Sequence, residues 1–215
     1  PNLSVRENIA ASRWLNASSE RNLKQIEQNP LEIFPEIAER LDEPAANLSG
    51  GQQQMLGLAM ALHSKPKVLL IDELSLGLAP AVVERILPVI KQIADQGTAV
   101  IIVEQSVNLA LTIADRAYFM EKGQIRFAGS TKELLNRPDL LRSVFLSNTL
   151  ISAVETSSKP SSKETKTILE IEDMTRSFGG ILAVNSVTFD VRSNEIIGIM
   201  GPNGAGKTTL FDLLS

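Results

Sequence analysis

The feature that most constrains the fold is a glycine-rich stretch close to the C-terminal end, Gly201-Pro202-Asn203-Gly204-Ala205-Gly206-Lys207-Thr208. It matches the pattern G-x-x-x-x-G-K-[ST], follows the predicted strand "EIIGIM" and precedes a predicted helix. In this context the backbone N–H groups are expected to surround the β- and γ-phosphates of a nucleotide, at the positive end of the helix dipole. A glycine turn that merely joins strand to helix is the weaker alternative. We therefore expect an α/β fold with a phosphate-binding loop.

Two side chains of this loop have distinct expected roles. Lys207 is expected to neutralise phosphate charge, and the Thr208 hydroxyl is expected to ligate Mg²⁺. An acid that completes the metal shell is needed elsewhere in the chain. The run "VLLIDE" supplies it, because Asp72 and Glu73 stand at the end of a predicted buried strand, where α/β sheets place their ligands.

The acid pair predicts a division of labour. Asp72 is expected in the Mg²⁺ shell, and Glu73 lies one residue closer to the γ-phosphate and attacking water, as suits a general base. Taken alone, two acids at a strand end are more often a solvated end. Their combination with a second glycine-rich stretch favours the functional interpretation.

That second stretch is Leu48-Ser49-Gly50-Gly51-Gln52, which opens a predicted helix. Ser49 is suited to the N-cap position, and the bare glycines would let a phosphate approach the helix N-terminus. From physical chemistry alone, an ordinary capped helix explains these residues equally well.

The remaining pattern is an alternation of strands and helices. Ser4 and Glu7 form a capping box that begins a helix, and short helices broken by Pro30, Pro35 and Pro44 are expected over residues 20–46. The runs 66–73 and 97–105 read as buried parallel strands, joined by a helix that begins at Pro80. Pro88 lies inside that helix and predicts a bend.

The second half of the chain contains a change of composition. "RAYFMEKGQIRFAG" predicts a hairpin that turns at Lys122-Gly123, and helices led by Ser130 and Pro138 follow. Residues 152–167 are rich in Ser, Thr, Lys and Glu, which predicts a linker. Three predicted strands and the phosphate loop come after it.

Composition narrows the class of protein. The net charge of −4 argues against a general nucleic-acid binder, and the absence of cysteine fits a reducing compartment, so cytoplasm is the default expectation. The most apolar stretch, 99–114, is interrupted by polar residues and is too short for a membrane span. Because the chain begins at Pro1 and stops after the phosphate loop, both ends are expected to be truncations.

Three motifs together carry a family resemblance. "LSGGQQQM", "KVLLIDELSLGLAP" and "GPNGAGKTT" resemble the signature, Walker B and Walker A motifs of ATP-binding cassette (ABC) ATPases. The resemblance implies a P-loop NTPase fold with a helical subdomain, ATP and Mg²⁺ as cofactors, and ATP hydrolysis. It also implies that the nucleotide site includes Thr209 beside the Walker A loop. The signature residues Ser49, Gly50, Gly51 and Gln52 are implied to belong to this site as well.

The order of the motifs is reversed for one cassette, because Walker A comes first in that family. Residues 1–150 therefore resemble the back part of a first cassette, 151–166 a linker, and 167–215 the front of a second cassette. We favour a permuted single cassette over two separate unfinished pieces. Lys207 near Asp72, with their strands in one sheet, would support it.

Finer details resemble one branch of the family. "DELSLGLAP" and "VEQS" are similar to ATPases of branched-chain amino-acid importers, one of whose paralogues has Gln at the switch position, here Gln105. "RSFGGILAVNSVTFDV" is similar to the other paralogue, in which Phe178 is the candidate for stacking on adenine; a hairpin core Phe is the alternative. Leu74 and Ala79 depart from the family pattern, which leaves communication between cassettes in doubt.

The resemblance implies integral-membrane permeases and a second cassette as partners, at the cytoplasmic face of the membrane, and no nucleic acid. Two other classes stay open. One is a soluble twin-cassette ATPase that acts on ribosomes or DNA, and the other is a catalytically inactive piece that only binds or assembles.

Overall fold

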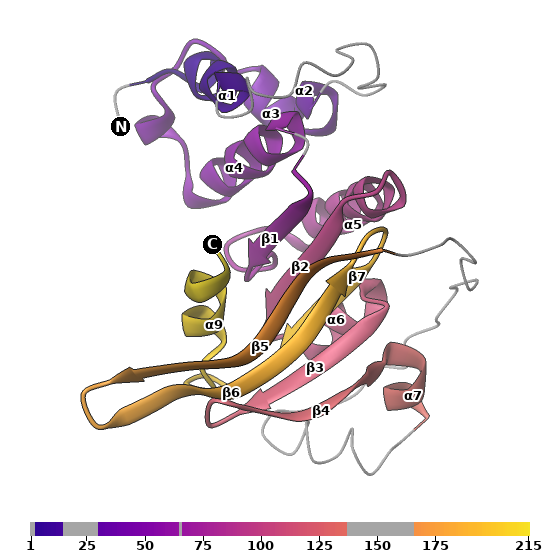
Figure 1. Cartoon of the computed structure of the whole chain (residues 1–215). Helices are drawn as coiled ribbons and strands as arrows, with labels where there is room; N and C mark the ends of the chain where they lie inside the picture. The colour runs from indigo at the N-terminus through magenta and orange to yellow at the C-terminus, as the bar shows by residue number, and fades with distance from the viewer. Residues whose placement is uncertain (1–2, 15–29, 65, 137–165) are drawn as a thin grey trace. The chain divides into compact units, whose positions relative to one another are not determined.

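The computed structural model describes residues 3–14, 30–64, 66–136 and 166–215, and these divide into two compact units. The first comprises residues 1–66 and 76–88, and the second comprises 67–75 and 89–215. The ribbon in Figure 1 shows the helices and strands of each unit.

The first unit is helical. It holds α1 (Val5–Trp14), α2 (Pro30–Ile33), α3 (Pro35–Ala38), a 3₁₀ turn (Ala45–Asn47), α4 (Gly50–Ser64) and the first half of α5 (Pro80–Asp95). The predicted capping box is confirmed, since Ser4 N donates to Glu7 Oε2 at 2.7 Å and Glu7 N donates to Ser4 Oγ at 3.2 Å. Apolar side chains from α1, α4, α3 and the residue before α3 are buried in its core. These include Val5, Phe34, Ile37 and Leu56.

The second unit is built on a five-stranded sheet of order β1-β2-β7-β3-β4 (Figure 1). The strands are β1 (Val68–Asp72), β2 (Ala99–Glu104), β7 (Ile196–Met200), β3 (Arg116–Glu121) and β4 (Gln124–Ser130). The first four run parallel, and β4 is antiparallel to β3. β2 and β7 are buried along their whole length, which agrees with their unbroken apolar sequences.

The strand that leads into the phosphate loop therefore lies at the centre of a sheet whose other four strands come from residues 68–130. This is the arrangement that a permuted single cassette predicts. One detail differs from the expectation: β7 does not pair with residues 68–72, because β2 lies between them, with Ile101 opposite Ile197.

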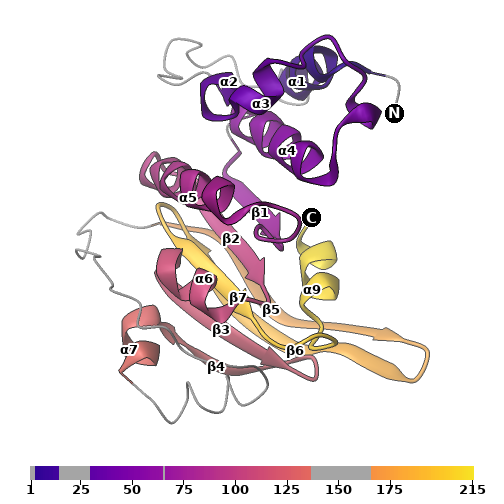
Figure 2. The same ribbon diagram turned by 180° about the vertical axis from the view of Figure 1, so that it is seen from behind.

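A long hairpin covers one face of this sheet. β5 (Thr167–Phe178) and β6 (Ile181–Arg192) pair antiparallel. Val184, Val187 and Phe189 of the hairpin share a hydrophobic core with Ile101 and Ile199 of the sheet. Figure 2 shows α6 (Val107–Ile113) on the opposite face, so the sheet is covered on both sides.

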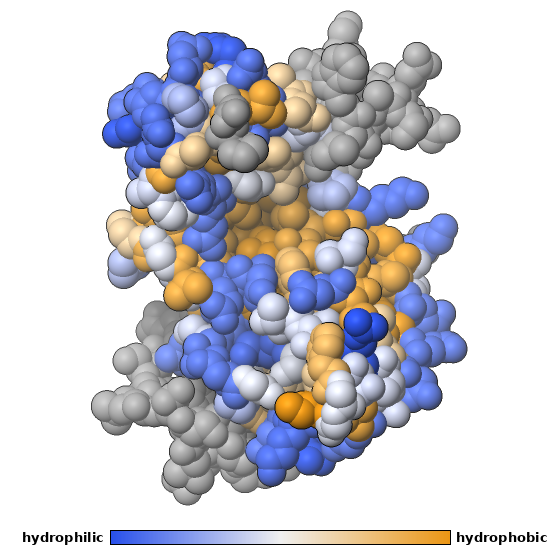
Figure 3. All heavy atoms as spheres, turned by 90° about the vertical axis from the view of Figure 1, so that its left-hand side faces the viewer, coloured by the Kyte–Doolittle hydropathy of each residue, from blue (hydrophilic) through white to orange (hydrophobic). Residues whose placement is uncertain are grey.

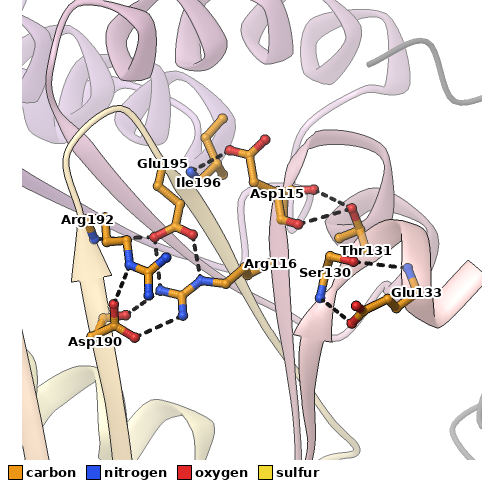
Figure 4. A network of polar contacts seen from close by, with 10 residues as sticks. Asp115, Arg116, Ser130, Thr131, Glu133, Asp190, Arg192, Glu195 and Ile196 are labelled. Atoms are coloured by element: carbon orange, nitrogen blue, oxygen red, sulfur yellow. Dashed lines mark hydrogen bonds and ion pairs between the residues drawn. The ribbon is translucent and has the colours of Figure 1, made fainter. Parts of the chain in front are cut away.

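A polar network fastens the two halves of the chain within this unit (Figure 4). Arg116 at the start of β3 donates from Nε to Glu195 Oε1 at 2.5 Å and from Nη1 to Asp190 Oδ1 at 2.9 Å. Asp190 also accepts from Arg192 Nε at 2.6 Å. Beside them Asp115 Oδ2 accepts from Ile196 N at 2.9 Å, which fixes the start of β7.

The ion-pair partners in this network shift the pKa values of Arg116 and Asp190. Burial opposes the charge of Arg116, but hydrogen bonds to Glu195 and Asp190 outweigh it and raise the pKa of the guanidinium. Burial likewise opposes ionisation of Asp190, and the bonds from Arg116 and Arg192 outweigh it and lower the pKa of Asp190. The network therefore favours the ionised form on both sides.

Several local predictions are confirmed. The β3–β4 hairpin turns at Lys122-Gly123, and Ser130 forms a capping box with Glu133 at the start of α7 (Thr131–Leu135). α5 runs continuously through Pro88, so the bend there stays a prediction. The helix led by Pro138 falls outside the described residues. So does the predicted linker at 152–167, except for its last two residues, Lys166 and Thr167. Among the helices that the structure describes, none is both long and apolar enough for a membrane span.

Candidate functional site

The predicted phosphate loop lies between β7 and α9 (Lys207–Leu214), as its sequence context requires. Gly206 is the N-cap of α9, with φ of +100°, and no side chain of the described residues caps this helix. A Cβ on Gly206 would overlap the carbonyl oxygen of Ala183, and one on Gly201 would overlap that of Met120. Two of the loop glycines are therefore required by close backbone packing as well as by backbone conformation.

Lys207 closes this loop from within. It is only 5% exposed, and its Nζ donates to Gly201 O at 2.8 Å and to Pro202 O at 3.1 Å. Burial lowers the pKa of Lys207, while the negative charges of Glu73 and Asp72 act against this change. The ammonium group therefore lies in the field of the acids predicted to share its site, although they are more than 130 residues away in sequence.

Asp72 ends β1 with one carboxylate oxygen unsatisfied. Burial raises the pKa of Asp72, Glu73 and Asp212 raise it further, and Lys207 opposes them. Its Oδ1 is buried and finds no hydrogen-bond donor among the described residues. A buried carboxylate oxygen without a donor is costly unless a cation or water meets it. Asp72 thus fits a role as ligand of Mg²⁺, a cation that prefers oxygen donors.

Glu73 follows in a conformation that few residues other than glycine adopt. Its φ is +48°, and its backbone N–H donates to Val103 O at 2.8 Å, so the end of β2 holds this strained residue in place. Strain of this kind is concentrated at functional sites. The geometry therefore suits the predicted role of Glu73, which stays a prediction.

Sequence reasoning missed a supporting acid, Glu104. It is 1% exposed and accepts from Ser75 N at 3.0 Å and from Ser75 Oγ at 3.2 Å. The bonds join the segment after Glu73 to the end of β2, where the exposed Gln105 follows. The sequence feature that could have indicated Glu104 is an acid at the last position of a strand whose other residues are all apolar.

The signature stretch lies in the helical unit. Ser49 and Gln52 form a capping box on α4: Gln52 N donates to Ser49 Oγ at 3.3 Å, and Ser49 N donates to Gln52 Oε1 at 2.9 Å. A Cβ on Gly51 would come within 2.8 Å of Gly77 O, whereas one on Gly50 would meet nothing within 4 Å. Packing explains Gly51 and leaves Gly50 unexplained. A role of these four residues toward a phosphate remains a prediction.

Phe178 lies at the exposed end of the β5–β6 hairpin. It is 53% exposed, and the guanidinium carbon of Arg176 lies 5.0 Å from its ring centroid. Ile181 and Leu182 are exposed beside it, and Figure 3, which looks toward this end of the hairpin, shows hydrophobic residues among hydrophilic ones. The alternative of a hairpin core Phe is therefore wrong. Stacking on adenine is compatible with this exposure and stays a prediction.

Comparison with known proteins agrees with this site. Residues 184–215 match the family model "ABC transporter", and residues 6–109 match the model "AAA domain, putative AbiEii toxin, Type IV TA system". The high-affinity branched-chain amino acid transport ATP-binding protein BraG of Pseudomonas aeruginosa is 42% identical over 136 residues, which are 63% of this chain and 58% of BraG. The chain is thus similar in sequence to ABC ATPases.

Two further relatives show the range of this ABC family. The glutamine transport ATP-binding protein GlnQ of Geobacillus stearothermophilus is 33% identical over 70% of this chain and 62% of GlnQ. A "Putative ABC transporter ATP-binding protein" of Methanosarcina mazei is 30% identical over 87% of this chain, but only 37% of that protein. The chain thus spans less than two thirds of the length of each of these relatives.

The fold agrees with solved ABC structures. The "Structure of ATP binding subunit of ABC transporter" superposes with a TM-score of 0.59 at 19% identity, over 67% of this chain and 62% of that one. "An inward-facing conformation of a putative metal-chelate type ABC transporter" gives 0.53 at 20% identity, over 68% and 59%. These similarities establish the ABC cassette fold and nothing finer.

Proposed function

We propose that this chain is part of an ATP-hydrolysing subunit that powers a membrane importer for branched-chain amino acids or similar small solutes. One observation carries the proposal: the buried ammonium of Lys207 in the phosphate loop lies in the field of Asp72 and Glu73 at the end of β1. The name of BraG, a branched-chain amino acid transport ATP-binding protein, supports the solute class.

In the proposed reaction the protein positions phosphates and water. The phosphate loop and Lys207 bind the triphosphate, and Glu73 polarises the attacking water. Asp72 and Thr208 would hold Mg²⁺, which when bound neutralises charge on the β- and γ-phosphates. Base assistance of the kind assigned to Glu73 is commonly worth ~10²–10⁴ in rate.

Gln105 gives this site a particular character. An amide does not take up a proton near neutral pH as an imidazole does, so Gln105 donates a hydrogen bond to a γ-phosphate without shuttling charge. We propose that the site beside Gln105 is the less active of two in the parent protein. Loss of most of the parent's ATPase activity in Gln105→Ala would contradict this.

We further propose that the chain comes from the junction of two fused cassettes. The match with the M. mazei protein supports this, because a match that covers 87% of this chain must include the signature, the two acids and residues 137–165 in this order. That protein is also much longer, since the same match is only 37% of it. The partners of the protein from which this chain comes would be permease subunits at the cytoplasmic face of the membrane, and a second cassette.

The test is ATP binding and phosphate release, measured on this chain and on the full-length parent. Glu73→Gln should leave the affinity for ATP within about twofold and slow single-turnover hydrolysis at its site by ~10²–10⁴. Glu84→Gln, an exposed acid on α5, is the matched control and should change neither quantity. Unchanged hydrolysis in Glu73→Gln would remove Glu73 from the role, and absence of ATP binding by the wild type would overturn the proposed function.

The rival soluble twin-cassette ATPase is tested on the parent. Stimulation of its ATPase activity by permease subunits in lipid vesicles supports the importer. Stimulation by ribosomes or DNA instead would support the rival class.

A further inference from the structure

The turn between β3 and β4 makes contacts that none of the assigned motifs explains. Gly123 N donates to Ala205 O of the phosphate loop at 2.9 Å, and Gly123 O accepts from Asn185 N of β6 at 2.8 Å. The turn, β6 and the phosphate loop therefore meet through their backbones. Both partners of the turn are at least 60 residues away from it in sequence.

The packing at this point is too close for a side chain. A Cβ on Gly123 would lie 2.8 Å from Ala183 O and 3.2 Å from Leu182 O. A Cβ on Gly206 would lie 3.5 Å from the Cα of Gly123 and would overlap Ala183 O. The turn and the phosphate loop thus both require glycine where they approach β6.

The hydrogen bond to Ala205 also sets the direction of a donor. The peptide between Ala205 and Gly206 is planar and trans, so its C=O and N–H point to opposite sides. With the Ala205 carbonyl directed toward Gly123, the Gly206 N–H is directed away from the turn. The last N–H of the glycine-rich loop before α9 is therefore oriented by a residue outside the loop.

We propose that the Lys122-Gly123 turn is a positioning element of the phosphate loop, which holds the Gly206 N–H in the orientation needed to donate to a phosphate. The proposal rests on the proposed nucleotide-binding function of the loop. It deepens that function by assigning a role to a turn that contains no phosphate-binding motif.

The turn is itself rigidly placed. Lys122 and Gly123 have φ of +49° and +78°, as in the two-residue turns that match the twist of a hairpin. The turn directly continues β3, and β3 pairs with β7, with Phe119 opposite Met200, immediately before the loop. Turn and loop are thus attached to neighbouring strands of the same sheet.

The test compares two glycine substitutions in the full chain. Gly123→Ala places a methyl group against Ala183 O, whereas Gly97→Ala places one at a φ that is also positive, +109° compared with +78°, with only the Asn194 side chain nearby, at 3.8 Å. Amide hydrogen exchange of the peptides that cover 201–209 is measured without nucleotide, followed by titration with a fluorescent ATP analogue. The two variants share the strain of a left-handed alanine and differ in contact with the loop.

We expect Gly123→Ala to speed amide exchange in the loop by at least about threefold and to lower the affinity for the ATP analogue by a similar factor. Gly97→Ala should stay near the wild type in both quantities. Equal exchange in the loop of the two variants would overturn the proposal. Because exchange is measured without nucleotide, failure of the wild type to bind the analogue would count against the proposed function and not against the turn.

Lys122→Asn provides a second variant in the opposite direction, in case Gly123→Ala does not fold. Asn adopts positive φ more readily than Lys and is preferred before Gly in such turns. Lys122→Asn should therefore slow amide exchange in the loop and slightly raise the affinity for the ATP analogue. Faster exchange in the loop of Lys122→Asn, at unchanged thermal stability, would contradict a positioning role.

Discussion

Two helices of this protein have glycine-rich N-terminal ends, and their first backbone N–H groups are satisfied differently. At α4 the side chains of Ser49 and Gln52 close a capping box, so the helix satisfies its own first backbone groups. At α9 the N-cap is Gly206, and within the part of the chain that the structure describes no side chain caps the first N–H groups of the helix. A glycine-rich turn before a helix is therefore not enough to indicate a phosphate site. The absence of an internal cap makes the end of α9 ready for a ligand.

The scaffolds behind the two helix ends also differ. The turn at α4 is held by neighbours in the same helical unit, such as Gly77 against Gly51. The loop at α9 stands on β7, whose position depends on the bonds of Arg116 to Asp190 and Glu195, 74 and 79 residues away in sequence. The end that is ready for a ligand thus depends more on long-range contacts.

The largest expected effect concerns this scaffold. Arg116→Met leaves Glu195, which is 7% exposed, and Asp190 without their main partner, and breaking a buried ion pair costs about 3 kcal/mol. Chemical denaturation should show this loss in the free energy of unfolding. Arg126→Met is the control, because Arg126 makes only an exposed ion pair with Glu121 at 3.5 Å. Equal losses in both variants would show that the network does not stabilise the sheet.

The second effect concerns the ligand itself. Lys207→Ala removes a charged donor from the loop, worth about 2 kcal/mol, so the affinity for an ATP analogue should fall about 30-fold. Lys91→Ala, an exposed lysine on α5, should bind as the wild type does. Titration by fluorescence measures both. An affinity unchanged in Lys207→Ala would mean that α9 is not the nucleotide end.

The third effect tests the other helix end. Ser49→Ala removes the cap of α4 and should cost about 1 kcal/mol of stability. The affinity of the loop at α9 for the analogue should stay within about twofold in this chain. A loss of affinity as large as that of Lys207→Ala would erase the difference drawn between the two ends.

The smallest effect is a pH dependence confined to the scaffold of α9. The folded-state pKa of Asp190 lies below its usual 3.8, so Asp190 stabilises the fold above that value, and the contribution is lost as the pH falls through the folded-state pKa. Unfolding measured between neutral pH and the acid range should show a shallower decline in Asp190→Asn than in the wild type. Parallel declines would place the acid sensitivity elsewhere.

Local patterns of the sequence were sufficient for much of this structure. The capping boxes at Ser4 and Ser130, the turn at Lys122-Gly123 and the phosphate loop each depend on residues within a stretch of eight positions or fewer, and all are confirmed as structures. The placement of the acids opposite Lys207 followed from motif order together with the family resemblance.

Contacts between distant segments could not be predicted in this way. The position of β2 between β1 and β7, the bonds of Arg116 and the approach of Gly123 to Ala205 join residues with no shared local pattern. Glu104 was missed for a related reason, because its partner Ser75 is 29 residues away. Pairing of this kind is decided by packing in the folded chain and not by short-range periodicity.

The central claim is that Asp72, from the first half of the chain, and the loop of Lys207, from the second, form one metal–nucleotide site. Its most direct test is the Mg²⁺ dependence of ATP-analogue affinity in the wild type, in Asp72→Asn and in the control Glu170→Gln, an exposed acid on β5. Mg²⁺ should tighten binding in the wild type and the control, and this gain should fall by about tenfold in Asp72→Asn, a loss of about 1.4 kcal/mol. The same Mg²⁺ gain in all three proteins would contradict the claim.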